Sequence, residues 1–326
     1  ANLNRADLRV GGVAKDGNSF AAAQGVNFKG ANLSGAQLTG SLAGKADFSD
    51  AIMTGINIMG ADLRDASMEG ADLSGAKVVG ANLLGAKMKA AILTGVDLSG
   101  MTENDADFSE AITDANIGLS VNDMEVPLVQ MVDMHRTWVA SKGEEGEQLD
   151  LTGVDMRPLE TLKEEKLTAM KAVGARFFGM NLYKVEMQSS ALDDCDFRRC
   201  DMEEADLRGG TFKGARFNHA NLKNANFEPL MFGNSLASKR FSPSDFEGAS
   251  LSYANFSGCK MKSANFRDAD LTYCDFTGAD LREADFTGAK IGNVNFDDAN
   301  LDGTTMRPSG RIFKMKTDTA ETGSES

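Results

Sequence analysis

A period of five residues governs residues 244–306 and constrains the fold more than any other feature. Every fifth residue is large and apolar, and a small residue, most often Ala, stands two places before it. An α-helix turns about 100° per residue and would scatter the large residues around its axis, while an odd step along a flat strand would alternate faces. The period therefore predicts a chain that bends after every five residues and keeps its large residues inside. The predicted core is Phe246, Leu251, Phe256, Met261, Phe266, Leu271, Phe276, Leu281, Phe286, Ile291, Phe296 and Leu301.

The spacing of the phenylalanines predicts how many repeats complete one coil. Phe recurs at every second repeat in this stretch, so a coil of four repeats would place identical rings above one another. Phe246, Phe266 and Phe286 would then form one column. Stacked coils about 4.8 Å apart suit offset ring stacking.

The repeat Ala-(Asp/Asn)-Leu-x-x, carried without interruption from Ala249 to Leu301, resembles that of the pentapeptide-repeat family. This resemblance implies an all-β solenoid made of right-handed quadrilateral β-helices. Residues 1–118 carry a first array of the same period. Leu8 and Phe28 are four repeats apart, which predicts that its register continues through the degenerate residues 10–25.

The pattern of residues 119–173 differs from that of both arrays. It predicts a short α-helical insert that covers array ends. Leu128, Val132, His135 and Val139 recur at helical spacing, and a second helix is expected over 158–173. Repeat-like residues lie between them at 149–156. A solenoid end exposes unpaired backbone and an apolar core, so a helical cap has a physical role.

Residues 174–308 form the second predicted array, and 309–326 a tail. The interval from Phe227 to Phe246 is not a multiple of five, so residues of about 228–243 should leave the coil as a loop. Within the tail, Ile312 and Phe313 are suited to close the last coil, and its polar end is expected to be partly disordered.

Composition narrows the possible functions. The net charge is −14, whereas a protein that binds nucleic acid through its phosphates is normally basic, so direct nucleic-acid binding is not expected. No apolar run approaches the ~20 residues that span a bilayer, and no signal peptide is recognisable, so a cytoplasmic protein without membrane contact is expected.

The side chains offer no evident catalytic chemistry. All four cysteines occupy the small inward place. Cys195 and Cys200 would lie on different walls of the coil and no histidine shares their inward column, which argues against a metal site. The two histidines lie near no Ser or Cys nucleophile. We therefore expect no catalytic residues, no cofactor and no metal, and an enzyme is the remotest alternative.

Function should therefore lie on the surface, and an interaction scaffold for a protein partner, which the sequence does not identify, is the first hypothesis. Homodimerisation through an array end or the helical insert is a further option. The candidate partner-binding residues lie in the loop and on the helix. They are Met231, Phe232, Lys239, Arg240, Phe241, His135 and Trp138.

The alternative is a DNA mimic that binds DNA gyrase or another topoisomerase. The segments 195–200 and 251–256 and the interrupting loop are similar to those of quinolone-resistance members of the family. The second array is nearly balanced in charge, however, whereas duplex DNA carries one negative charge per about 1.7 Å.

Overall fold

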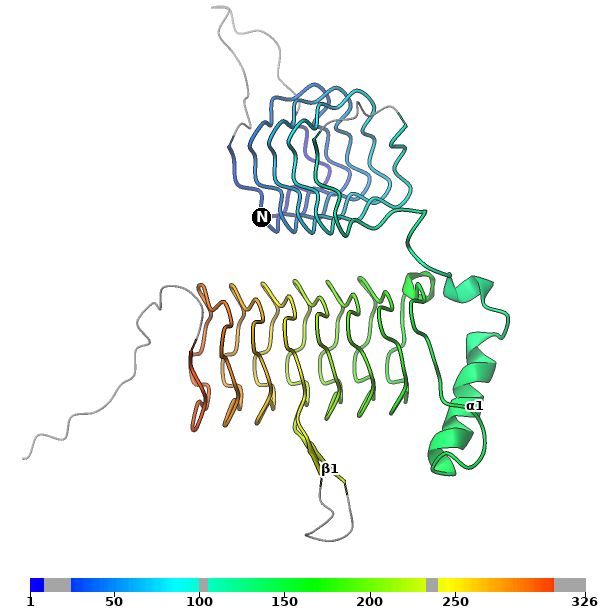
Figure 1. Ribbon diagram of the computed structural model, residues 1–326. Coiled ribbons are helices and arrows are strands. Elements are labelled where there is room, and N and C mark those ends of the chain that lie inside the picture. Colours follow the sequence, from blue (N-terminus) through cyan, green and yellow to red (C-terminus); the bar gives the residue numbers. More distant parts are fainter. Residues whose placement is uncertain (9–24, 100–104, 233–239, 308–326) are drawn as a thin grey trace, which may run out of the picture. The chain divides into compact units, whose positions relative to one another are not determined.

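A computed structural model describes residues 1–8, 25–99, 105–232 and 240–307. The chain divides into two compact units, a first unit of residues 1–118 and a second unit of residues 119–326. Within the described ranges, regular elements are few: the 3₁₀ turns η1 (Val121–Asp123) and η2 (Arg157–Leu159), the helix α1 (Leu128–Ala140), and the strands β1 (Leu230–Phe232) and β2 (Arg240–Ser242). Both units otherwise consist of stacked coils (Figure 1).

The coils are held together by parallel bridges between residues four repeats apart. Asn255 pairs with Asp275, and Asp275 pairs with Asn295, one bridge per five-residue repeat. A repeat therefore forms one side of a four-sided coil, and we call the stack of equivalent repeats a wall. The fold is a β-helix with four walls, in agreement with the coil of four repeats predicted from the Phe spacing.

One repeat shows why Asn or Asp precedes the large residue. The Phe266 N–H donates to the Asp285 carbonyl of the next coil at 2.8 Å, and the Ala269 N–H donates to the Phe266 carbonyl at 3.1 Å, closing the turn. Oδ1 of Asn265 accepts from the Arg267 N–H at 3.1 Å. The amide side chain therefore satisfies a backbone donor at the bend, as in an Asx-turn.

The predicted Phe columns are present in the second unit. Phe266 stacks between Phe246 and Phe286 with ring centroids 5.1 and 5.0 Å away. Phe276 stacks between Phe256 and Phe296 in the same way. From Phe246 to Phe286 the inward residues are fully buried, whereas Ile291, Phe296 and Leu301 are only partly buried, because they lie in the last described coil.

The register predicted across the start of the first unit is wrong. Asn2 pairs with Asn32 and Asp7 with Gln37, a spacing of six repeats instead of four. Leu8 therefore lies beneath Leu38 rather than beneath Phe28. The first coil is longer than a regular one by the length of two repeats, so the apparent four-repeat interval was a coincidence. Residues 9–24 lie outside the described part of the chain.

The second helix predicted over 158–173 is also wrong. Apart from η2, these residues form coil: Thr161 pairs with Asn181 and Lys166 with Glu186. The coils of the second unit already begin at Leu149, since Asp150 pairs with Lys171. Leu162, Leu167 and Ala172 keep the five-residue step and point inward, and burial along that step outweighs the helical propensity of the segment.

The helix α1 covers the N-terminal end of the second unit (Figure 1). Val132 and His135 are its buried residues, and Leu128 and Met131 pack against the core at its edge. Ser120, just before η1, adds a parallel bridge to Asp155 of the first coil. The described helices include none that is both long and apolar enough to cross a bilayer.

The strands β1 and β2 form a hairpin that projects from the middle of the second unit (Figure 1). Thr211 pairs with Asp245, whereas a regular coil would bring position 231 to this place, so a segment between them leaves the coil. The register on either side of the hairpin is unchanged, because Asp206 pairs with Asn226 before it and Asp245 pairs with Asn265 after it, each four repeats apart. The predicted tail at 309–326, with Ile312 and Phe313, lies outside the described residues.

Candidate functional site

The hairpin presents an apolar pair on one of its faces. Met231 and Phe241 are register partners, and they are 57% and 53% exposed. Leu230, on the opposite face, packs so closely on Gly209 that a Cβ there would lie 3.1 Å from the Cβ of Leu230. Leu230 therefore anchors the hairpin to the coil, while Met231 and Phe241 face away from it.

The remaining loop candidates are Phe232, Arg240 and Lys239. Phe232 and Arg240 are register partners at the ends of β1 and β2, and Lys239 lies outside the described residues. The two remaining candidates, His135 and Trp138, lie on α1 at the end of the second unit, whereas the hairpin leaves from its middle (Figure 1). The candidates therefore fall into two separate groups.

His135 attaches α1 to the coils. The ring is fully buried; its Nδ1 accepts the Leu149 N–H at 3.1 Å, and Nε2 lies 2.9 Å from the Thr168 carbonyl. Trp138 is partly buried and stacks beside His135, with ring centroids 5.7 Å apart. The Ser141 hydroxyl binds the loop after α1 through the backbone of Glu145. The segment from His135 to Gly146 therefore builds the cap.

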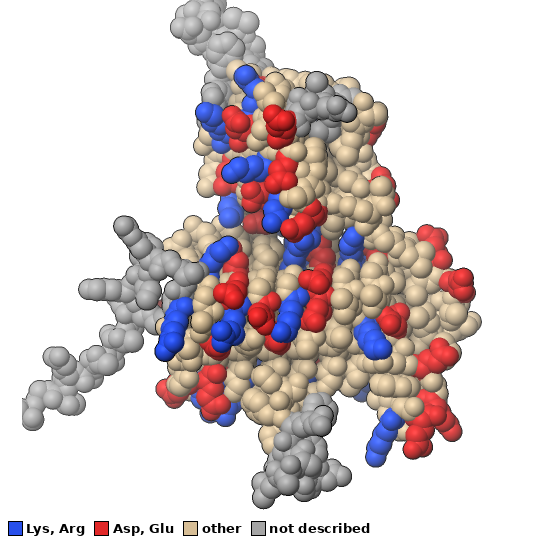
Figure 2. All heavy atoms as spheres, viewed as in Figure 1, with Lys and Arg blue, Asp and Glu red and all other residues tan. Residues whose placement is uncertain are grey.

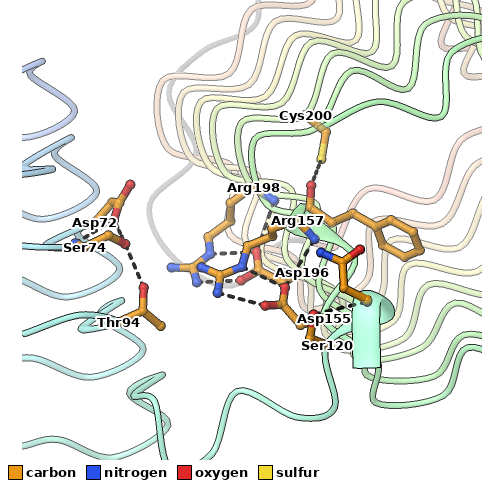
Figure 3. Close-up of polar contacts among 11 residues, drawn as sticks. Asp72, Ser74, Thr94, Ser120, Asp155, Arg157, Asp196, Arg198 and Cys200 are labelled. Atoms are coloured by element: carbon orange, nitrogen blue, oxygen red, sulfur yellow. Dashed lines mark hydrogen bonds and ion pairs between the residues drawn. The ribbon is translucent and has the colours of Figure 1, made fainter. Parts of the chain in front are cut away.

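Many charges on the walls are paired within one repeat. Where Asp precedes the inward residue and Arg follows it, the guanidinium binds its carboxylate through two nitrogens, as Arg198 binds Asp196 at 2.8 and 2.6 Å. Figure 3 shows this pair and the equivalent pair of Arg157 and Asp155. Burial raises the pKa of Asp196, but the adjacent Arg198, together with the charge of Arg216, more than offsets this and leaves the pKa below its usual value.

Further ion pairs join successive coils. Lys213 bridges Asp245 and Glu247, and Arg267 binds Asp285. Figure 2 shows basic and acidic side chains interleaved on the face of the second unit that is in view. These walls are therefore mixed in charge rather than uniformly acidic.

The structure also reveals surface features that the sequence analysis missed. In the first unit, Met59, Val79 and Leu84 are 38%, 49% and 46% exposed. Each stands one place after an inward residue. An apolar residue at this place in the repeat is therefore the sequence pattern that could have predicted the exposed side chains. On the second unit, His219, Tyr253 and Tyr273 stack in a column with centroids 4.8 and 4.7 Å apart.

The first unit carries a row of hydroxyls on one wall. The Thr54 hydroxyl donates to Ser34 at 2.9 Å, and the Thr94 hydroxyl donates to Ser74 at 3.1 Å. Ser74 in turn donates to the Asp72 carboxylate (Figure 3). Because the Thr–Ser hydrogen bonds run between adjacent coils, they help to fix the register of the stack.

The cysteines behave as small inward residues that can donate a hydrogen bond. The Cys195 thiol donates to the Ala172 carbonyl at 2.8 Å and the Cys200 thiol to the Phe177 carbonyl at 2.9 Å. Burial raises the pKa of each of the four thiols, so the reactive thiolate is disfavoured. In the described ranges, no group of three or more His, Cys, Asp or Glu is arranged to hold a metal ion.

Comparisons with known proteins agree with the repeat pattern. A family model of pentapeptide repeats matches residues 21–42, 27–65, 44–78, 66–101, 240–268 and 264–303. A second pentapeptide-repeat model matches residues 192–236. No protein with curated annotation matches the chain at a significant level.

Several solved structures are similar in their repeats. HetL, a pentapeptide-repeat protein involved in heterocyst differentiation regulation from the cyanobacterium Nostoc sp. strain PCC 7120, is 22% identical over 89% of each chain, with a TM-score of 0.23. Rfr23, from the cyanobacterium Cyanothece 51142, is 16% identical over 47% of this chain and 92% of its own, with a TM-score of 0.26. Full-length QnrB1, a plasmid-mediated fluoroquinolone resistance protein, is 16% identical over 73% of this chain and 92% of its own, with a TM-score of 0.20. The matched family models and the coils of four repeats together show that this chain belongs to the pentapeptide-repeat family.

Proposed function

We propose that the chain is a non-catalytic interaction scaffold, in which the right-handed quadrilateral β-helices of its two units carry rigid binding surfaces. The observation that carries the proposal is the exposed pair Met231 and Phe241 on a hairpin anchored to a fully packed coil. Two large apolar side chains side by side at a projecting position are typical of the centre of a protein interface.

The packing of the second unit supports this function. Inward residues from Phe246 to Phe286 fill the coil, which leaves no interior space for a substrate among them. The hairpin enters and leaves without changing the register, since the bridges on both sides keep the same spacing. The coil can therefore fold independently of the hairpin, and the hairpin sequence is free to serve a partner.

The test is a double substitution, Met231→Ser with Phe241→Ser. We expect partner affinity to fall roughly tenfold or more, because the two side chains would lie at the centre of the contact. Affinity capture from the source organism with mass spectrometry would identify the partner, and titration calorimetry would measure the loss. The melting temperature should not change, because both side chains already face solvent.

The matched control is Val79→Ser with Leu84→Ser in the first unit, which removes a comparable exposed apolar area. It should leave affinity for the same partner unchanged. If the parent chain and the hairpin variant bound the partner with equal affinity, the hairpin would be excluded as the contact. If only the control variant lost affinity, the contact would lie on the first unit.

The second candidate function is a DNA mimic that binds gyrase, but the charge pattern of the second unit favours it less. Bidentate pairs such as Arg198 with Asp196 and Arg282 with Asp280 neutralise the carboxylates on the same walls. The expected result of a gyrase supercoiling assay, with and without a quinolone, is no effect at micromolar protein. Inhibition, or protection from the drug, would favour the mimic instead.

A further inference from the structure

We propose that protonation of His135 detaches α1 from the coils, so that the cap at the N-terminal end of the second unit is released by mild acid. The buried imidazole links the helix to two different coil segments, at Leu149 and Thr168. This inference is independent of the function proposed for the hairpin.

The hydrogen bonds fix the protonation state of the ring. The Leu149 N–H can only donate, so Nδ1 must be the unprotonated nitrogen, and Nε2 carries the proton and donates to the Thr168 carbonyl. A second proton on Nδ1 would face the Leu149 N–H as donor against donor. The charged ring would also be fully buried. Both effects favour the detached state of the helix, in which the ring is in water.

Neighbouring charges offer the charged ring little compensation. The charged groups on the elements packed around it include Asp133 and Arg136 on α1. The following loop carries Lys142, Glu144, Glu145 and Glu147, and the coils carry Asp150, Glu164, Glu165, Lys166 and Lys171. Arg136 is already bound to both Asp133 and Glu165, and all three side chains are in contact with solvent. Burial is therefore the main cause that lowers the pKa of His135, opposed by the hydrogen bond to Thr168.

The direction of the pH effect follows from linkage. In the detached state the imidazole has an ordinary pKa of about 6.5. Its pKa is lower when the cap is attached, so the attached state loses stability as the pH falls below about 6.5 and is unaffected above it. When detachment takes up a single proton, the equilibrium constant for detachment of α1 rises by up to about tenfold for each pH unit below about 6.5.

Release would expose the edge of the first coil. Leu149, Leu151 and Met156 are fully buried in the capped state, and the Leu149 N–H would lose its acceptor. An exposed coil edge is a template for pairing with another chain. Acid would therefore convert a closed end of the solenoid into an open one, while coils further along remain intact, because each coil depends mainly on its neighbours.

The experiment is hydrogen exchange of the full chain at pH 7.5 and 5.5, expressed as protection factors so that the intrinsic pH dependence is removed. We expect protection of α1 and of the Leu149 amide to fall by up to about tenfold at pH 5.5, with no change in the coils from 180 to 227. Constant protection of α1 across this range in the unmodified chain would overturn the proposal.

Two variants separate His135 from other titrating groups. His135→Gln keeps a neutral acceptor and donor, so protection of α1 should no longer depend on pH, whatever its level. His219→Gln removes the other histidine of the chain and should leave the pH dependence as in the parent. A pH dependence retained by His135→Gln, or lost with His219→Gln, would assign the effect elsewhere.

Discussion

Substitution of Phe266 by Asp should unfold the second unit. Phe266 is fully buried and stacks against a Phe ring on either side. Loss of a buried Phe costs about 3–5 kcal/mol, and a carboxyl group placed there without a partner adds at least about 2 kcal/mol. The sum is of the order of the whole stability of a domain. Far-ultraviolet circular dichroism and the melting temperature would measure the loss.

Phe266→Leu is the matched control for this prediction. Leu occupies the equivalent inward place at Leu271 and Leu281, so the variant should fold with a loss of only about 1 kcal/mol. A Phe266→Asp variant that melts like the parent chain would mean that position 266 does not face the core. The four-sided coil would then be wrong for the whole array.

The five-residue step predicted the coil, the columns and the inward residues of the second unit, because the backbone period alone decides which side chains point inside. It failed where the repeats are degenerate. Leu8 and Phe28 are one regular coil apart in the sequence, but the first coil is longer than a regular one by two repeats, so this spacing does not reflect the register. At 158–173, Leu159 and Leu162 fit a helical spacing while Leu162 and Leu167 fit the five-residue step, and the pairing with the next coil decided between the two patterns.

The candidate surface was only partly accessible to sequence reasoning. The irregular interval after Phe227 indicated that a segment leaves the coil, but the pairing of Met231 with Phe241 depends on the hairpin register. The hydrogen bonds by which His135 attaches α1 could not be deduced from helical spacing, because its two partners, Leu149 and Thr168, come from separate coil segments. Such long-range contacts have no signal in a single sequence.

Substitution of Gly146 by Ala should destabilise the cap by about 2–5 kcal/mol, the sum of a backbone cost and a packing cost. Gly146 has φ +76°, which costs an L-residue about 1–2 kcal/mol, and overpacking adds about 1–3 kcal/mol. A Cβ there would lie 2.7 Å from the Trp138 backbone nitrogen and closer still to the Met134 carbonyl oxygen. Both are backbone atoms of α1, so the loop and the helix would have to separate.

The single tryptophan of the chain makes this prediction directly measurable, because Trp138 lies in the cap itself. In Gly146→Ala its fluorescence should shift toward the emission of a solvated indole, and exchange protection of α1 should fall. The control is Gly153→Ala, which shares a positive φ of +70° but has no atom within 4 Å of the added Cβ. It therefore bears the backbone cost without the clash, and its Trp138 emission should stay native. If both variants lost the cap equally, backbone conformation rather than close packing of the loop on α1 would control its attachment.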